Sequence, residues 1–273
     1  MNLHEHDIVL LNTSAGKDSQ AMIDRVLRLA DEQAYPKDRI HAVHADLGRV
    51  EWQGTRALAA EQASHYGVRF YVVRRPQGDL LQHVEARGKW PGYQTRYCTS
   101  EHKRNQILVL ITKLVDEYRR ATWGAGPHDK GVPKVRVLNC LGLRAEESSK
   151  RKAMPVTERN PNSNGKREIT NWLPIHEMNE PQVWETIKRS GVRHHWAYDL
   201  GMPRLSCCFC FYAPKQALLI AGEHNPALLR EYVRVEQKIG HTFKPDLSLI
   251  QISDALARGE RGTATNMTWG QCA

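Results

Sequence analysis

The feature that most constrains this 273-residue chain is an apolar run that breaks into small polar residues and then resumes with helical spacing. Residues 7–12 are mostly apolar and precede turn-forming residues, which is typical of a buried strand. From Ser19 onward, apolar side chains recur at helical spacing. The segment IVLLNTSAGKDSQAMIDRVL therefore predicts a strand, a tight turn around Gly16 and a helix.

Such a turn makes an anion site, because it directs unpaired backbone N–H groups and the positive end of a helix dipole to one point. Lys17 adds a cation there, and Ser14 and Ser19 add hydroxyl groups. Asp18 can orient a loop amide or bind a magnesium ion. The residues of the turn therefore indicate a ligand that carries phosphate groups.

The spacing excludes two common phosphate-binding loops. The Walker A loop requires a glycine and a hydroxyl residue where this chain has Leu11 and Asp18. The dinucleotide loop GxGxxG is excluded because Gly16 is the only glycine between residues 1 and 47. The sequence SAGKDS instead resembles the PP-loop, usually SGGKDS, of the N-type ATP pyrophosphatases, with Ala15 in place of the first glycine.

The PP-loop resemblance implies that ATP binds here and that an oxygen of the substrate attacks its α-phosphate, releasing pyrophosphate. Downstream, the sequences ADLGRVEWQGT, GLRAEESSKR and NWLPIHEMNEPQVWETI resemble the phosphoadenosine phosphosulfate (PAPS) reductase branch of this family. The motif pattern is most similar to that of the DNA phosphorothioation ATP pyrophosphatases. The ATP-binding residues that the resemblance implies are Ser14, Ala15, Gly16, Lys17, Asp18, Ser19, Asp46, Gly48 and Gly142.

The resemblance also implies four catalytic residues, Lys17, Asp18, Arg144 and Arg151. The two arginines can bind phosphate or sulfate oxygens in a bidentate manner, and they would hold the α-phosphate or the acceptor. Two simpler interpretations stay open. Asp46 can cap a turn, and the two arginines can pair with the glutamates of their own segment.

Alternating strand and helix signals continue beyond the turn and predict an α/β fold. We expect an open, doubly wound, mostly parallel sheet of five or six strands, as in the adenine nucleotide alpha hydrolase-like fold that the PP-loop resemblance implies, with a mainly helical C-terminal extension. The polar, Asn- and Gly-rich stretch ERNPNSNGKRE predicts a mobile loop. The predicted regions are a PP-loop nucleotide-binding domain at 1–157, a flexible loop at 158–170, and a cysteine-containing, mainly helical region at 171–273 packed on the same cleft.

Three cysteines crowd into RLSCCFCFY, a pattern that suits a metal or redox site better than a disulfide framework. In iron–sulfur relatives, cysteines of comparable segments bind a [4Fe–4S] cluster, and the resemblance implies Cys98, Cys207 and Cys210 as ligands with Cys208 as a fourth candidate. A zinc site and metal-free structural or redox cysteines are the alternatives. Cys272 lies near the terminus, where PAPS reductases carry a nucleophilic cysteine, but the tail WGQCA shares little else with theirs.

A formal net charge of +9 and a pI near 9.3 favour polyanionic partners such as nucleotides or nucleic acid. The sequence has no run of about 18 apolar residues, and its start, MNLHEHD, lacks the pattern of a signal peptide. We therefore expect a cytoplasmic protein with no membrane association. The oligomeric state stays open, with a dimer as one option.

These patterns together predict an enzyme that adenylylates an acceptor oxygen with ATP and Mg²⁺ and then transfers sulfur to the acceptor. The expected partners are the nucleotide, DNA or tRNA, and a sulfur donor such as a cysteine desulfurase. The first alternative is a reductase that releases sulfite from PAPS or adenylylsulfate. The small subunit of a GTP-driven ATP sulfurylase and a non-catalytic, nucleic-acid-binding iron–sulfur protein are further alternatives.

Overall fold

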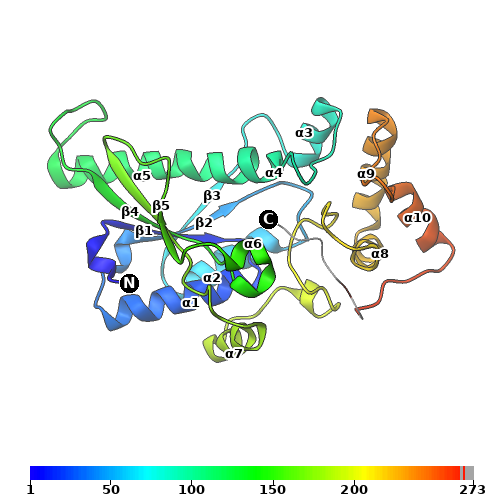
Figure 1. Cartoon of the computed structure of the whole chain (residues 1–273), viewed down its shortest axis with the longest axis horizontal. Helices are drawn as coiled ribbons and strands as arrows, with labels where there is room; N and C mark the ends of the chain where they lie inside the picture. The colour runs from blue at the N-terminus through cyan, green and yellow to red at the C-terminus, as the bar shows by residue number, and fades with distance from the viewer. Residues whose placement is uncertain (265–266, 268–273) are drawn as a thin grey trace.

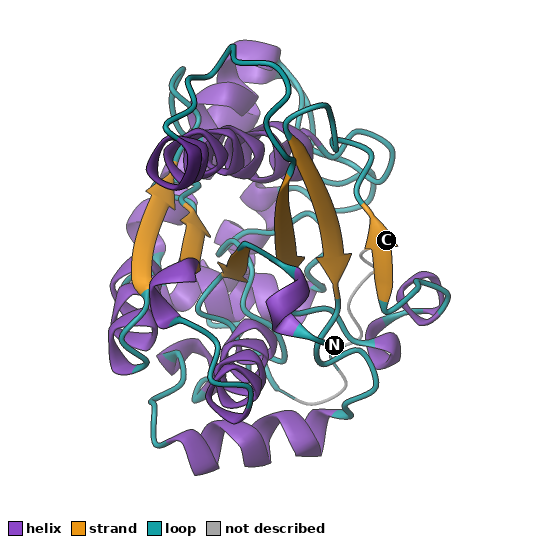
Figure 2. Ribbon diagram, turned by 90° about the vertical axis from the view of Figure 1, so that its left-hand side faces the viewer, coloured by secondary structure: helices purple, strands orange, loops and turns teal. Residues whose placement is uncertain are grey.

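The computed structural model describes residues 1–264 and 267, and its central element is a six-stranded sheet. The strand order is β3-β2-β1-β4-β6-β5, and β5 is antiparallel to β6 while the other neighbours are parallel. Figure 2 shows the strands side by side as one layer. The predicted open, mostly parallel α/β sheet is therefore confirmed. The strands are β1 Ile8–Thr13, β2 Ile40–Ala45, β3 Arg69–Val73, β4 Val135–Cys140, β5 Thr157–Arg159 and β6 Arg167–Trp172.

Helices follow most strands, as the hydrophobic spacing predicts. They are α1 Lys17–Glu32, α2 Thr55–His65, α3 Leu80–Arg87, α4 Tyr97–Thr99, α5 Asn105–Trp123, α6 Ser149–Lys152, α7 Glu180–Ser190, α8 Lys215–His224, α9 Pro226–Ile239 and α10 Leu249–Ala257. A π-helix over Ser100–Arg104 joins α4 to α5, and 3₁₀ turns include Trp196–Tyr198. None of the helices in the described residues is long and apolar enough to cross a membrane.

The two faces of the sheet carry different helices because side chains alternate along each strand. In β1, Val9 and Leu11 pack in a core shared with α1 and α7, whereas Ile8 and Leu10 pack against α5. Figure 1 shows α5 on one side of the sheet and α1, α2 and α7 on the other. The continuous apolar run of β1 therefore reflects burial on both faces, as is usual for parallel strands.

A second hydrophobic core lies beyond the carboxyl ends of the strands. It joins α8, α9 and α10 to α3 and to residues of the loops after β2 and α3, including Val50, Trp52 and Trp90. Figure 1 shows these three helices beside α3, at one end of the sheet. The mainly helical C-terminal extension is thus present, and it shares its core with segments from the first hundred residues.

The stretch 158–170, for which the sequence predicts a loop, contributes to both strands of the β5–β6 hairpin at the edge of the sheet. A row of asparagines connects this hairpin to β4 and β1. Asn12 donates to Asn139, Asn139 donates to Asn171, and Asn160 also donates to Asn171, at 2.7–3.0 Å. No apolar pattern marks the hairpin, because β5 is fully exposed and most residues of this stretch are polar. The predicted domain boundaries around it stay a prediction.

Candidate active site

Residues 14–16 lie at the carboxyl end of β1, between the neighbouring strands β2 and β4. The strand order reverses here, and open α/β sheets bind their ligands at such a switch point. Ala15 is fully buried and has φ = 58°, in the left-handed region that costs a residue with a Cβ atom about 1–2 kcal/mol. The chain therefore forms a strained turn where a PP-loop usually has glycine.

The hydroxyl groups of the loop form hydrogen bonds within the turn. The Ser14 N–H donates to Ser19 Oγ at 3.2 Å, and Ser19 Oγ donates to the Gly16 carbonyl at 2.9 Å. The Ala15 N–H donates to Thr13 Oγ1 at 3.2 Å. Helix α1 then starts at Lys17, and the first amides of a helix have no acceptor within it. The turn is thus shaped to present the start of α1 to an anion.

Lys17 is buried, and both of its nitrogens contact the C-terminal region. Its N–H donates to the Tyr198 hydroxyl at 2.8 Å, and its Nζ donates to the Pro203 carbonyl at 3.0 Å. Nζ also lies 3.4 Å from Asp18 Oδ2. The segment around Tyr198 therefore covers the start of α1.

Asp18 forms an ion pair with Arg144, whose Nε lies 2.6 Å from Asp18 Oδ1. The Arg144 side chain is 3% exposed and also pairs closely with Glu146. Burial alone would lower the pKa of Arg144, but the charge and hydrogen bond of Asp18 and the pairing with Glu146 raise it. The guanidinium thus ties the loop after β4 to the start of α1.

Arg151 lies further along the same loop and pairs closely with Glu147. The other carboxylate oxygen of Glu147 is 3.5 Å from Arg204. Both predicted arginines therefore have carboxylate partners, in line with the simpler of the two interpretations of this segment. Their binding to phosphate stays a prediction.

Gly142 packs directly against the backbone at the start of α1. A Cβ atom at this position would lie 2.9 Å from the Asp18 carbonyl oxygen and 2.9 Å from the Ser19 nitrogen. The contact is with main-chain atoms, which cannot move aside as a flexible side chain can. A glycine is therefore required here to bring the end of β4 against the PP-loop.

The second predicted ATP-binding segment is built around a turn. The Gly48 N–H donates to Asp46 Oδ1 at 2.7 Å, and Arg56 lies 3.9 Å from the other carboxylate oxygen. Gly48 has φ = +81°, and a Cβ atom there would lie 2.4 Å from the Asp79 Cβ atom. Asp46 thus caps a turn in this structure, and its contact with a nucleotide stays a prediction.

Cys98, Cys207 and Cys210 lie close enough to interact electrostatically with one another and with Lys103. Burial raises the pKa of Cys207 well above its ordinary value, although the Lys103 charge opposes the rise. Burial also acts to lower the pKa of Lys103, but electrostatic interaction with the neighbouring cysteines and Glu51 raises it. Lys103 belongs to the π-helix, a rare geometry that is frequent at functional sites.

The cysteine segment is attached to the loop after β2. The Cys208 N–H donates to the Val50 carbonyl at 2.9 Å, and Cys207 forms a β-bridge with Glu51. Cys208 itself is fully buried in the second hydrophobic core. Cys208 is therefore placed as a core residue, and Cys272 lies outside the described residues.

No group of three or more His, Cys, Asp or Glu side chains in residues 1–264 and 267 is placed to hold a metal ion. The three thiols, with a lysine ammonium among them, do not fit a [4Fe–4S] cluster or a zinc ion as arranged. The implied ligand set of Cys98, Cys207, Cys210 and Cys208 stays a prediction from the resemblance.

Sequence reasoning missed Tyr198, and it indicated His195 only as a residue that lines the cleft or binds anions, without its partners. His195 is buried, its Nδ1 accepts the Ala197 N–H at 3.1 Å, and its Nε2 lies 3.2 Å from Thr55 Oγ1 at the start of α2. Burial lowers its pKa to about 4. The sequence HHWAYDLGMPRL has no helical or alternating pattern that could reveal these contacts.

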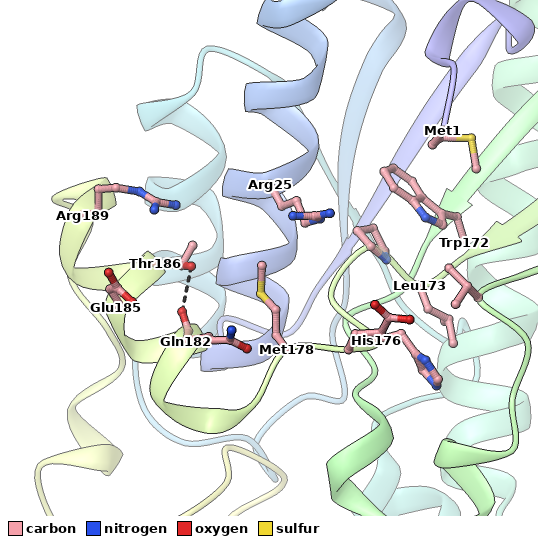
Figure 3. A pocket seen from close by; sticks show the side chains of 13 residues that line it. Met1, Arg25, Trp172, Leu173, His176, Met178, Gln182, Glu185, Thr186 and Arg189 are labelled. Carbon is pink, nitrogen blue, oxygen red and sulfur yellow. Dashed lines mark hydrogen bonds between the residues drawn. The ribbon is translucent and has the colours of Figure 1, made fainter.

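A cavity of about 650 Å³ lies away from the PP-loop, between α1, α7 and the loop after β6. Figure 3 shows Arg25 of α1 and Arg189 of α7 on opposite sides of Met178, with Trp172 at the far end. None of the residues predicted to bind ATP or metal lines this cavity. The cavity therefore belongs to the outer face of the α1 and α7 layer.

The fold and the loop after β1 define an α/β nucleotide-binding class of protein with a PP-loop. The family model of the phosphoadenosine phosphosulfate reductase domain matches residues 8–213, and the chain belongs to this family. An uncharacterized 37.8 kDa protein in the gpa 5′ region of Escherichia phage 186 is 25% identical over 167 residues, which cover 59% of this chain and 43% of that protein. The chain thus spans less than half the length of that relative.

Solved structures with a similar arrangement include three enzymes. The PAPS reductase of Candida auris in a phosphate complex is 18% identical, with 73% of this chain and 80% of that chain covered and a TM-score of 0.46. The FMN adenylyltransferase of Candida glabrata with FMN and an ATP analogue is 12% identical, with 74% and 55% covered and a TM-score of 0.45. The U34-tRNA thiolase NcsA of Methanococcus maripaludis with its [4Fe–4S] cluster is 13% identical, with 93% and 72% covered and a TM-score of 0.38.

Proposed function

We propose that this protein uses Mg·ATP to adenylylate an oxygen of an acceptor and then replaces that oxygen by sulfur. In the first step the acceptor oxygen attacks the α-phosphate, an acceptor–O–AMP bond forms, and pyrophosphate leaves. In the second step a sulfur nucleophile at the oxidation level of hydrosulfide displaces AMP, which carries away the original oxygen. No net oxidation or reduction occurs in this sequence.

The observation that carries the proposal is the nearly complete PP-loop at the switch point of the sheet. A protein that only reduced a sulfated nucleotide would have no pyrophosphate to release, and SAGKDS departs from the usual loop only at Ala15. Lys17 and the first amides of α1 would stabilise the charge that develops on the departing pyrophosphate. Positioning of the acceptor at the same edge would supply much of the remaining rate enhancement.

The thiols next to Lys103 support the sulfur-transfer step. Cys98, Cys207 and Cys210 converge from two distant parts of the chain on one lysine, whose charge partly opposes the rise that burial causes in the pKa of Cys207. We propose that one of these thiols receives sulfane sulfur as a persulfide from a partner such as a cysteine desulfurase. A second thiol then attacks the persulfide and releases hydrosulfide, which forms a cysteine–cysteine disulfide that an external dithiol such as thioredoxin must reduce. No step of the proposed reaction passes through a metal cluster.

An aromatic surface beside the thiols supports a nucleic acid as the acceptor. The Tyr93 side chain is 61% exposed and packs edge-on against Phe211 at 4.9 Å and Tyr212 at 5.1 Å between ring centroids. The Arg96 guanidinium lies 5.6 Å from the Tyr212 centroid. Unpaired bases stack on such exposed aromatic rings, and arginines nearby attract the phosphate backbone. The formal charge of +9 agrees with this acceptor.

The test is incubation of the protein with ATP labelled at the α-phosphate, Mg²⁺, sulfide and a panel of DNA and tRNA acceptors. We expect AMP and pyrophosphate to form in equal amounts and labelled sulfur to enter one acceptor class. Absence of AMP and pyrophosphate with every acceptor would contradict the proposal. Release of sulfite from PAPS or adenylylsulfate with thioredoxin, lost in Cys272→Ala, would favour the reductase alternative.

A further inference from the structure

The Tyr198 hydroxyl lies where the start of α1 would meet a phosphate oxygen. It accepts the Lys17 N–H at 2.8 Å, and the Leu205 backbone hydrogen-bonds to the same hydroxyl. Two amides from segments almost 190 residues apart therefore meet at one oxygen. Convergent backbone N–H groups of this kind are the usual means of binding an oxyanion.

The same C-terminal segment also holds the ammonium group of Lys17. Lys17 Nζ donates to the Pro203 carbonyl at 3.0 Å and lies 5.7 Å from the centroid of the Tyr198 ring. Both of these partners are uncharged, and the only charged partner of Nζ in the described residues is Asp18, at 3.4 Å. A phosphate oxygen would make a charge-assisted hydrogen bond with Nζ, which is roughly twice as strong as a bond to a neutral acceptor.

Packing keeps Tyr198 over the loop. Its ring lies edge-on to Trp184 of α7, with 5.1 Å between the ring centroids. Gly16 accommodates the hydroxyl, because a Cβ atom at Gly16 would lie 3.3 Å from it. The segment then turns at Gly201, which has φ = +83°, before it reaches Pro203. The hydroxyl is thus held at the loop by contacts on both sides.

We propose that Tyr198 is a neutral stand-in for a phosphate oxygen and that it closes the PP-loop until Mg·ATP displaces it. After displacement, the N–H groups of Lys17 and Leu205 both bind the nucleotide, so the C-terminal segment becomes part of the phosphate site. The inference rests on the proposed function, because it assigns a gate to the same nucleotide site. The gate lowers the apparent affinity for ATP by the free energy of the contacts that must be broken.

The test is calorimetric titration of the full chain with the α,β-methylene analogue of ATP and Mg²⁺. We expect Tyr198→Phe to bind the analogue about tenfold more tightly than the unmodified protein, since one competing hydrogen-bond acceptor has been removed. Tyr35→Phe is the matched control, because the Tyr35 hydroxyl donates to the His6 carbonyl at 3.0 Å, outside the proposed site. The control should bind with unchanged affinity.

A second measurement follows the amides of the unmodified protein by NMR after selective ¹⁵N labelling of lysine and leucine. We expect the signals of Lys17 and Leu205 to shift together on addition of the analogue. The gate is overturned if the protein binds the analogue but Tyr198→Phe binds it equally or less tightly, or if Leu205 does not shift. Failure of both the unmodified protein and Tyr198→Phe to bind would instead contradict the proposed function.

Discussion

The PP-loop and the thiol group lie at the same end of the sheet, yet the protein builds them in different ways. The loop is local: residues 13–19 supply its turn and most of its internal hydrogen bonds. The thiols come from a short helix near residue 98 and from a loop near residue 207, and they depend on the second hydrophobic core for their position. The difference separates a site set by local sequence from one set by tertiary packing.

This contrast assigns a different chemical step to each region. A pre-formed loop suits the binding and cleavage of ATP, which needs fixed donors for the pyrophosphate. A group of thiols around Lys103 suits a nucleophile that must be protected from solvent. Changes in one region should therefore affect one step and leave the other intact.

The largest effect is expected from Lys17→Met, which keeps most of the buried side-chain volume but removes its charge. We expect the rate of AMP and pyrophosphate formation to fall about 100-fold or more, as for loss of a donor that stabilises transition-state charge. Lys113→Met is the control, because the Lys113 side chain is 65% exposed on α5. Equal rates for the two variants would show that Lys17 has no part in the chemistry.

Cys207→Ser tests the other region. We expect incorporation of labelled sulfur supplied by a cysteine desulfurase to fall to background while AMP and pyrophosphate still form, because a serine hydroxyl cannot accept sulfane sulfur as a thiol does. Cys140→Ser is the control, since Cys140 is buried in β4 away from the thiols. A loss of both steps in Cys207→Ser would contradict the assignment of ATP cleavage to the PP-loop and of sulfur transfer to the thiols.

The acceptor surface is tested by Tyr93→Ala. We expect the affinity for a labelled single-stranded oligonucleotide to fall about tenfold, in keeping with the loss of one stacked base. Trp123→Ala is the matched control, because Trp123 is also a partly exposed aromatic residue but lies at the far end of α5. Fluorescence polarisation at two salt concentrations gives the measurement, and equal losses in both variants would argue against a stacking surface.

Gly142→Ala tests whether the loop needs its support from β4. The added methyl group would push against the backbone of α1, so we expect a loss of about 1–3 kcal/mol in the free energy of unfolding and weaker nucleotide binding. Gly165→Ala is the control, since no heavy atom lies within 4 Å of a Cβ atom placed there. Urea denaturation of the two variants decides the point, and equal stability would contradict the close contact.

A further effect is expected on the pH dependence of stability. Burial lowers the pKa of His195 to about 4, and an unfolded histidine titrates near 6.5. The unfolded state therefore binds more protons between these values, so stability is intact above pH 6.5 and falls as the pH drops toward 4. For His195 the loss between pH 7 and pH 5 is about 2 kcal/mol.

Unfolding of His195→Gln in urea at pH 7 and pH 5 measures this contribution. We expect the stability of His195→Gln to depend less on pH than that of the unmodified protein, whereas His128→Gln, at an exposed loop position, should keep the full dependence. An unchanged pH dependence in His195→Gln would mean that its imidazole does not remain neutral in the fold.

The contrast between the two regions also explains what the sequence could predict. The strand, turn and helix around Gly16 follow from local spacing, as do four of the parallel strands. The sequence predicts a loop where the β5–β6 hairpin lies, because β5 is short, polar and exposed at the sheet edge and polar residues surround Ile169 in β6. Propensity and periodicity carry little signal for a strand such as β5, whose three residues are all exposed and which hydrogen-bonds to β6.

Contacts between distant segments could not be predicted from the sequence either. The sequence could indicate Lys17 and Arg144 as charged groups of the site, but it could not show that Arg144 pairs with Asp18 or that Tyr198 covers the loop. These pairings depend on how the C-terminal region packs on the sheet. A single sequence carries little information on such contacts, so the residues of the gate emerged only from the structure.

The most direct test of the central claim is a crystal structure of the protein with the α,β-methylene analogue of ATP and Mg²⁺. We predict that the β- and γ-phosphates lie within hydrogen-bond distance of the backbone N–H groups at residues 16–19, with Lys17 Nζ on a phosphate oxygen. Binding of the phosphates elsewhere, with the start of α1 still covered by Tyr198, would contradict the account.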